Sequence, residues 1–101
     1  MRKIDLTKRA AEFLKQLPPK QCKQNFTAIL KLAVNPAPHD ASQLRGYDHL
    51  YRVDVGEYRI VYRFDRETVY VLLIGKRNEN EIYRELKRAS KSLLKEYGHY
   101  K

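Results

Sequence analysis

Cysteine, histidine and long apolar runs are scarce in this sequence of 101 residues, and each shortage excludes a class of protein. The one cysteine, Cys22, cannot form an internal disulfide, and the three scattered histidines lack the spacing of zinc ligands. The longest apolar run, Val69–Ile74, is far too short to cross a bilayer, and the charged first residues leave no apolar segment for a secretory signal. We therefore expect a single cytoplasmic domain over residues 1–101, with no disulfide, metal or other cofactor, or membrane span.

Acidic residues are also outnumbered, because 21 lysines and arginines stand against 12 aspartates and glutamates, a net charge of +9. A domain this basic attracts polyanions, nucleic acid first among them, although basic charge also serves solubility or an acidic protein partner. All eleven lysines lie in residues 1–35 and 76–101, whereas the five basic residues of the segment 36–75 are all arginines. Arginine offers a planar fork suited to phosphate, so we expect the lysines to form a general basic coat and the arginines to hold particular groups.

The spacing of the apolar residues predicts an α+β fold. A short strand is expected over Arg2–Thr7, followed by a helix over residues 6–17 that ends at a Pro-Pro pair. A second helix ends before the breaker segment 35–38. Its predicted buried stripe contains Cys22, Phe26, Ile29, Leu30 and Ala33. The two helices are expected to form a hairpin that packs on a small, mainly antiparallel sheet, with a further helix at the C-terminus.

From residue 50 the apolar period changes to two, which predicts strands. Strands over 50–55 and 58–64 are joined by the two-residue turn Gly56-Glu57, with glycine placed as in a type II′ turn. The register that buries the apolar face pairs Val55 with Tyr58, Val53 with Ile60 and Tyr51 with Tyr62. Residues 69–74, apolar on both faces, are predicted as the central strand, and Asn78 is expected to cap the last helix.

The same register gathers charged side chains on the sheet face turned away from the apolar core. This face carries Arg52, Asp54, Arg59 and Arg63. Arg77 lies just past the central strand, and Tyr83 lies in the predicted last helix. Several arginines around a shallow sheet suit a phosphodiester, and a nearby tyrosine suits proton transfer. The alternative is a solvated face of arginines balanced by acidic residues, in which Asp54 pairs with Arg59 directly across the hairpin and pins it.

Histidine and tyrosine add weaker candidates. His49, at the entry to the hairpin, is either a proton shuttle or an ordinary strand-edge histidine. The tyrosines on the core face of the hairpin are interpreted as packing residues: Tyr51, Tyr58 and Tyr62. Tyr47 and Tyr70 stay open as residues that stack on bases.

An ordered series of short motifs resembles the RelE branch of the RelE/ParE toxin superfamily. The series consists of Leu44-Arg45-Gly46, Leu50-Tyr51-Arg52-Val53, Gly56-Glu57-Tyr58-Arg59-Ile60-Val61-Tyr62, Gly75-Lys76-Arg77 and Ile82-Tyr83. The preceding helix pair fits the same plan, so the resemblance covers nearly the whole chain. It implies a RelE-like fold and a toxin of a type II toxin–antitoxin system.

The resemblance implies that the protein cuts mRNA in the ribosomal decoding site, where the message's own 2′-hydroxyl attacks the adjacent phosphate without a metal. By position, Arg59 and Arg77 match the arginines that stabilise the charged phosphate, and Tyr83 matches the tyrosine that activates the 2′-hydroxyl. Arg52 stands where RelE has a lysine, whereas Asp54 stands where RelE has a second lysine and so reverses the charge. The residues expected to bind substrate beside these are Arg45, Arg63 and Lys76.

The partners that the resemblance implies are a cognate antitoxin, in a complex such as a heterotetramer, together with the ribosome and mRNA. The antitoxin is expected to cover the basic surface with an acidic or amphipathic helical segment. Two other functions stay open. One is a ParE-like toxin that inhibits DNA gyrase without cutting RNA, and the other is an RNA- or ribosome-binding protein without toxicity.

Overall fold

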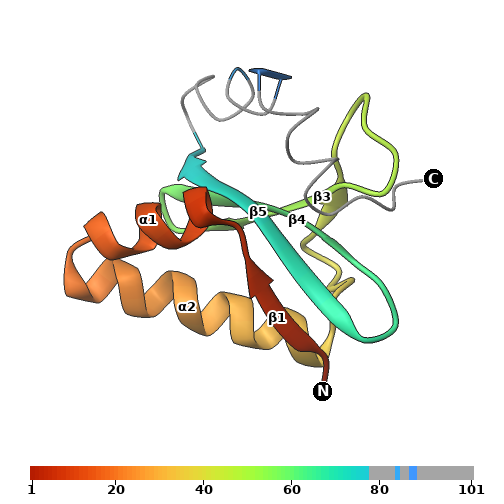
Figure 1. The fold of residues 1–101 in the computed structure, drawn as a ribbon, viewed down its shortest axis with the longest axis horizontal. Coiled ribbons are helices and arrows are strands. Elements are labelled where there is room, and N and C mark those ends of the chain that lie inside the picture. The colour runs from red at the N-terminus through yellow and green to blue at the C-terminus, as the bar shows by residue number, and fades with distance from the viewer. Residues whose placement is uncertain (78–83, 85–86, 89–101) are drawn as a thin grey trace.

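The computed structural model places the elements in the order β1, α1, α2, β2, β3, β4, β5 (Figure 1). It describes residues 1–77, 84, 87 and 88. The bounds are Lys3–Leu6 for β1, Lys8–Gln16 for α1, Pro19–Val34 for α2, Ser42–Gln43 for β2, Tyr51–Val55 for β3, Tyr58–Phe64 for β4 and Thr68–Lys76 for β5. The start of the predicted last helix at Asn78 lies outside the described residues. Within them, no helix has the length and apolar character that a membrane crossing requires.

The five strands form one sheet in the order β1-β5-β4-β3-β2. β1 runs parallel to β5, and the other neighbours pair antiparallel, which confirms the α+β fold and the mainly antiparallel sheet. The segment predicted as the central strand is β5, which lies between β1 and β4 and is buried from residue 71 to 75. Both helices pack on the same face of this sheet (Figure 1).

The hairpin of β3 and β4 has the predicted register. Val55 pairs with Tyr58, and Val53 pairs with Ile60. Gly56 has a φ of 58°, the left-handed value that a type II′ turn requires at this position and that glycine adopts without a steric cost. The register therefore places alternate β3 side chains against the helices and sends the side chains between them to the other face of the sheet.

Helix α1 begins at Lys8 because Thr7 caps it. The Thr7 hydroxyl accepts a hydrogen bond from the backbone N–H of Ala10 at 3.0 Å and donates one to the carbonyl of Leu72 at 2.6 Å. One side chain thus both caps the helix and ties it to β5. The prediction had begun this helix at residue 6, inside what is the strand β1.

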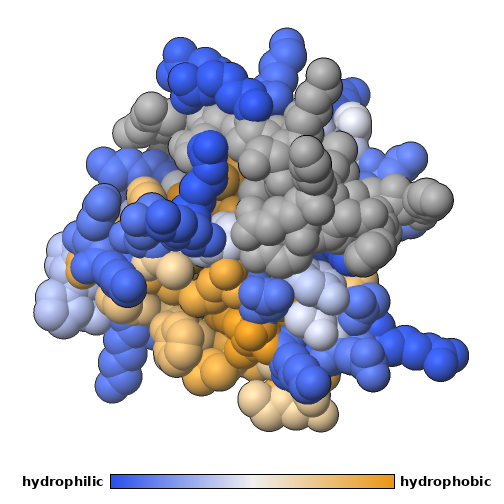
Figure 2. Space-filling model, in the orientation of Figure 1, coloured by the Kyte–Doolittle hydropathy of each residue, from blue (hydrophilic) through white to orange (hydrophobic). Residues whose placement is uncertain are grey.

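Helix α2 turns a different face to the core than its apolar spacing predicts. The helix residues buried in the core are Asn25, Ile29, Leu32 and Ala33. Phe26 and Leu30, both predicted to be buried, are 46% and 39% exposed. The buried Asn25 donates its side-chain N–H to the carbonyl of Gln21 at 2.9 Å, whereas its side-chain oxygen is buried without a hydrogen-bond partner. Because α2 buries this other face, Phe26 and Leu30 stay exposed and contribute to the apolar surface over α2 and β1 in Figure 2.

Apolar side chains are buried on both faces of the sheet, which the sequence predicted for residues 69–74 but not for the β3–β4 hairpin. The face away from the helices holds a second cluster of Leu44, Leu50, Val61, Leu72 and Leu73. Two of these leucines come from the segment that leads into β3, where the N–H of Leu44 donates to the carbonyl of Leu50 at 2.7 Å. Residues 36–46 have no apolar periodicity in the sequence, so the contribution of Leu44 to the core, like the short strand β2, was missed.

Candidate functional site

Three arginines from separate strands approach one another on the face away from the helices. Arg52 lies on β3 and Arg59 on β4, and Arg77 directly follows β5. The end of β5 is tied to the hairpin turn, because the N–H of Arg77 donates to the carbonyl of Glu57 at 2.9 Å. Across the same end of the sheet, Arg59 pairs with Gly75 on one side and with Asp54 on the other. Strand pairing therefore brings the three arginines to one end of the sheet.

The carboxylate of Asp54 lies at the centre of this arginine cluster. Arg59 contacts both of its oxygens, with Nε at 2.7 Å from Oδ1 and Nη2 at 3.3 Å from Oδ2. Arg52 Nη1 lies 3.9 Å from Oδ1, and Arg77 Nη1 lies 3.7 Å from Oδ2. The predicted cross-strand pair of Asp54 and Arg59 is confirmed. Sequence reasoning did not predict that Arg52 and Arg77 reach the same carboxylate.

The charges at the cluster hold Asp54 in its ionised form. The hydrogen bond from Arg59 is the main cause that lowers the pKa of the Asp54 carboxyl, and the charges of Arg59, Arg52 and Arg77 act in the same direction. Partial burial of the carboxyl raises its pKa, but by less than the arginines lower it. Three guanidinium groups and one carboxylate leave a local charge of about +2, so the cluster stays attractive to a phosphate group.

The three arginines differ in how far they reach into solvent. The Arg59 side chain is 15% exposed, against 34% for Arg52 and 45% for Arg77. Arg59 is therefore the fixed member, and Arg52 and Arg77 present guanidinium donors outward. Such a group stabilises negative charge on an oxyanion but is a poor proton donor, because a guanidinium group keeps its proton under physiological conditions. The described part of the site supplies charge stabilisation and little acid–base chemistry.

The other basic residues predicted at the site lie in different surroundings. Arg63 is buried, and its guanidinium carbon lies 4.3 Å from the centroid of the Tyr70 ring. This cation–π contact differs from the open arginine face that the sequence predicted. Lys76 is exposed at the end of β5, next to Arg77. Arg45 is exposed and lines a shallow hollow of about 410 Å³ together with Tyr47.

The remaining candidates are the tyrosines and one histidine. Tyr83 lies outside the described residues. Tyr58 and Tyr62 are buried as predicted, and the Tyr62 hydroxyl donates to the carbonyl of Pro36 at 2.7 Å. Tyr70 is engaged on both sides, because its hydroxyl donates to Asp65 at 3.1 Å while its ring covers Arg63. His49 is exposed with a φ of 67°, a left-handed backbone that turns the chain toward β3.

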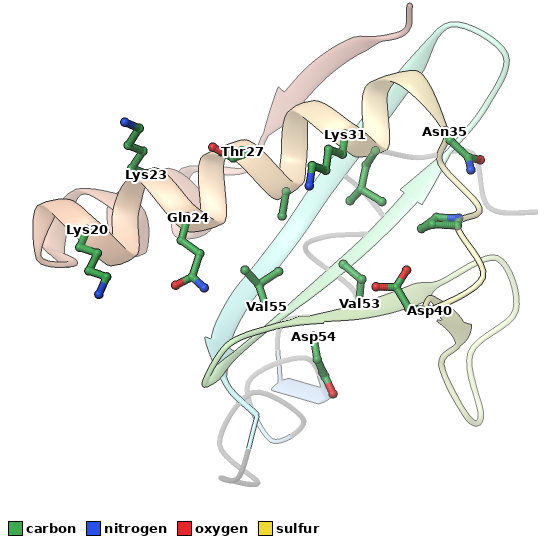
Figure 3. Close-up of a pocket in the computed structure, with 13 residues that line it drawn as sticks. Lys20, Lys23, Gln24, Thr27, Lys31, Asn35, Asp40, Val53, Asp54 and Val55 are labelled. Atoms are coloured by element: carbon green, nitrogen blue, oxygen red, sulfur yellow. The ribbon is translucent and has the colours of Figure 1, made fainter.

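A groove between α2 and β3 was not predicted. It has a volume of about 630 Å³, and its lining includes Lys20, Lys23 and Lys31 of α2 and Val53 and Val55 of β3. In Figure 3 the side chains of Lys20 and Lys31 extend toward the β3 side, whereas that of Lys23 extends away from it. The three lysines fall at helical spacing, which is the signal that sequence reasoning had treated only as a basic coat. Asp54 takes part in both the groove and the arginine cluster. It borders the groove, while in Figure 3 its side chain points away from α2, toward the face that carries the arginines.

Comparison with known proteins relates this chain to a group of bacterial and archaeal toxins. The family described as ParE toxin of type II toxin–antitoxin system, parDE, matches residues 4–81. A toxin candidate of Methanocaldococcus jannaschii, RelE1, is 37% identical over 62 residues, which are 58% of this chain and 69% of that protein.

Solved structures show the same arrangement of strands and helices. The E. coli toxin RelE, as an arginine double mutant in the free state, has a TM-score of 0.71 at 26% identity, with 86% of this chain and 96% of that chain covered. The archaeal RelE–RelB complex of Pyrococcus horikoshii matches with a TM-score of 0.66 at 22% identity, covering 77% of this chain and 97% of that chain. These likenesses confirm the RelE-like fold.

Proposed function

Since the chain belongs to the ParE/RelE family of toxins of type II toxin–antitoxin systems, we propose that it is an endoribonuclease that cuts mRNA on the ribosome and so inhibits translation. The observation that supports this most is the convergence of Arg52, Arg59 and Arg77 on one carboxylate-sized anion. A carboxylate and a phosphate both accept paired N–H donors from a guanidinium fork, so a place that holds one suits the other.

In the proposed reaction, the 2′-oxygen of a nucleotide attacks the adjacent phosphorus while the bond from phosphorus to the 5′-oxygen breaks. The 2′-hydroxyl loses its proton and the departing 5′-oxygen gains one, which leaves a 2′,3′-cyclic phosphate and a 5′-hydroxyl. Arg59 and Arg77 stabilise the charge that builds on the phosphate oxygens, and Arg52 adds a third cation. Tyr83 is proposed as the residue that takes the 2′-proton.

Two further residues are proposed to contact the substrate beyond the reacting phosphate. Lys76 directly precedes Arg77 at the exposed end of β5 and is placed to contact a neighbouring phosphate of the message. Arg45 lies at the hollow beside Tyr47, where an exposed arginine suits the backbone of a nucleic acid. Arg63 is given a positioning role instead, because it is buried against Tyr70.

The ionised Asp54 limits the acid–base chemistry that the proposed site can perform. A carboxylate whose pKa is lowered is a weak base and is not protonated at neutral pH, so it does not serve as the acid that protonates the 5′-oxygen. The described residues therefore lack a strong acid–base pair. This supports the part of the proposal in which the ribosome completes the site and the free protein cuts RNA slowly.

A ParE-like toxin that inhibits DNA gyrase is the second candidate. It is favoured by the match to the ParE family and by Asp54, which introduces a negative charge at the place where RNA is proposed to react. The two candidates share a fold and differ in the target.

The proposed partner in either case is a cognate antitoxin, because solved relatives include RelE chains bound to RelB. We propose that it covers the basic surface of this chain, with a heterotetramer as the assembled form.

The two functions are separated by induced expression of the chain, followed by mapping of mRNA 5′ ends and a DNA supercoiling assay. The nuclease predicts cuts in phase with codons that disappear with Tyr83→Phe, together with normal supercoiling. Intact messages combined with inhibited gyrase would replace the nuclease by the second candidate.

A further inference from the structure

The loop that leads into β3 gathers two charged side chains and a tyrosine around one hollow. Arg45, Tyr47 and Asp48 line this space of about 410 Å³, with Arg45 and Asp48 exposed and Tyr47 half-buried. None of the three side chains forms an ion pair or a hydrogen bond with another described residue. Their groups are therefore open to a ligand, unlike the hydroxyl of Tyr70, which donates to Asp65.

Backbone hydrogen bonds hold this loop in shape. The N–H of Leu44 donates to the carbonyl of Leu50 at 2.7 Å, and the N–H of Tyr47 donates to the carbonyl of Leu44 at 3.2 Å. Gly46 has a φ of 85°, the left-handed value that the third residue of a type II turn requires. A ligand thus meets a hollow whose walls are already formed.

Tyr47 lies on the same side of the sheet as the arginine cluster. It packs against the second apolar cluster, which lies on the face away from the helices. Arg52 projects to this face as well, because Tyr51 and Val53 on either side of it pack toward the helices. The strand rises by roughly 13 Å between residues 50 and 54. Single-stranded RNA covers such a distance with a few nucleotides.

Each of the three side chains in the hollow suits a different part of a nucleotide. The ring of Tyr47 offers a flat face on which an unpaired base can stack. The guanidinium of Arg45 matches the oxygens of a phosphate. The carboxylate of Asp48 repels phosphate but accepts hydrogen bonds, and the amino group of cytosine is a donor that suits an aspartate. Uracil carries a carbonyl oxygen at the same position, which the carboxylate repels.

We propose that this hollow binds one nucleotide of single-stranded RNA, a few positions away from the phosphate that reacts at the arginine cluster. The base stacks on Tyr47, the adjoining phosphate binds Arg45, and Asp48 accepts a hydrogen bond from the amino group of the base. The hollow therefore binds cytosine more tightly than uracil. This inference rests on the proposed function for the choice of RNA as ligand, and it concerns binding apart from cutting.

The test uses the full chain and two fluorescein-labelled 2′-O-methyl RNA octamers, one of cytidine and one of uridine. Neither octamer can be cut, because the oxygen that would attack the phosphate carries a methyl group. Fluorescence anisotropy measures the affinity, and the cytidine octamer is expected to bind about tenfold more tightly than the uridine octamer. NMR is expected to show nuclear Overhauser effects between the ring protons of Tyr47 and the base protons of the cytidine octamer.

Two variants of Tyr47 separate stacking from packing. Tyr47→Leu keeps an apolar side chain against the second apolar cluster but has no aromatic face, and is expected to bind both octamers about tenfold more weakly. Tyr47→Phe keeps the ring and is expected to bind like the parent. Phe26→Leu on α2 removes another exposed aromatic ring and serves as the control, with unchanged binding expected. If Tyr47→Leu fails to fold, the Overhauser effects in the parent protein still decide the question.

Salt dependence and base choice test the two charged residues. Arg45→Gln is expected to reduce the slope of log Kd against log salt concentration by about 0.7, the value for one phosphate contact on a single strand. The exposed Lys15 of α1 gives the control Lys15→Gln, which is expected to leave the slope nearly unchanged. Asp48→Asn is expected to bind the two octamers about equally, because an amide both donates and accepts hydrogen bonds.

The outcomes separate this hollow from the proposed reaction. Parental affinity in Tyr47→Leu, an equal loss in Phe26→Leu, or equal affinity of the parent for the two octamers would overturn the proposal. Failure of the parent to bind either octamer would count against the proposed function as well. Binding that depends on Tyr47, in a protein that does not cut mRNA on ribosomes, would count only against the proposed function.

Discussion

Arg59 holds both carboxylate oxygens of Asp54 across the β3–β4 hairpin, with Nε at 2.7 Å from one and Nη2 at 3.3 Å from the other. This forked contact fixes one of the two guanidinium groups that stabilise the phosphate in the proposed reaction. It also fills part of the anion site with a negative charge that belongs to the protein. A substrate phosphate must therefore share the arginines with Asp54 or displace its carboxylate.

Removing that charge is expected to strengthen RNA binding. Asp54→Asn raises the local charge from about +2 to about +3, and we expect a 2′-O-methyl RNA octamer to bind about tenfold more tightly. Asp54→Lys is expected to leave cleavage equal or faster. The control is Asp5→Asn on β1, at the opposite edge of the sheet. Anisotropy titrations of the parent, Asp54→Asn and Asp5→Asn measure the effect, and weaker binding by Asp54→Asn would show that the carboxylate is needed to position Arg59.

The same pair predicts a pH-dependent stability. The pKa of Asp54 is lowered by folding below its ordinary value of 3.8, so its ion pairs stabilise the fold at pH above that value. The stabilisation is lost as the pH falls through the lowered pKa. We expect Asp54→Asn to reduce the free energy of unfolding by about 1 kcal/mol at pH 7 and by much less near pH 2. Urea unfolding at both values checks this, and an equal difference at both would contradict it.

A second stability prediction concerns the buried end of the loop after α2. The Tyr62 hydroxyl donates to the carbonyl of Pro36 at 2.7 Å, and burial raises the pKa of this phenol well above its ordinary value. Tyr62→Phe leaves a buried carbonyl without its donor and is expected to lower the free energy of unfolding by about 1–2 kcal/mol. The half-buried Tyr51, whose ring packs against that of Tyr62, offers the matched change Tyr51→Phe. Equal stability of the two variants would show that the hydrogen bond contributes little.

The hairpin and its cross-strand pair could be predicted because they depend on local pattern. A period of two and a Gly-Glu turn are enough to set Val53 opposite Ile60 and Asp54 opposite Arg59. The approach of Arg77 could not be predicted in the same way. It depends on how β5 pairs with β4, where the register shifts between Val61 and Tyr62.

Which side chains of the helices and of the sheet are buried was harder to predict. Asn25 is buried and Phe26 is exposed, although only the side-chain N–H of Asn25 finds a partner within the helix, and apolar spacing predicts the opposite arrangement. Arg63 is buried because Tyr70 from the next strand covers its guanidinium. The groove depends on where β2 ends, and a two-residue strand leaves almost no signal in the sequence.

The most direct test is the cutting of a defined mRNA on purified ribosomes by the parent protein, Arg77→Ala and Arg66→Ala. Arg66 is an exposed arginine in the β4–β5 turn and serves as the control for loss of one positive charge. We predict that the parent leaves 2′,3′-cyclic phosphate ends, that Arg77→Ala cuts at least about 100-fold more slowly, and that Arg66→Ala cuts at nearly the parental rate. An intact message with the parent protein, or equal rates for the two variants, would contradict the proposed role of the arginine cluster.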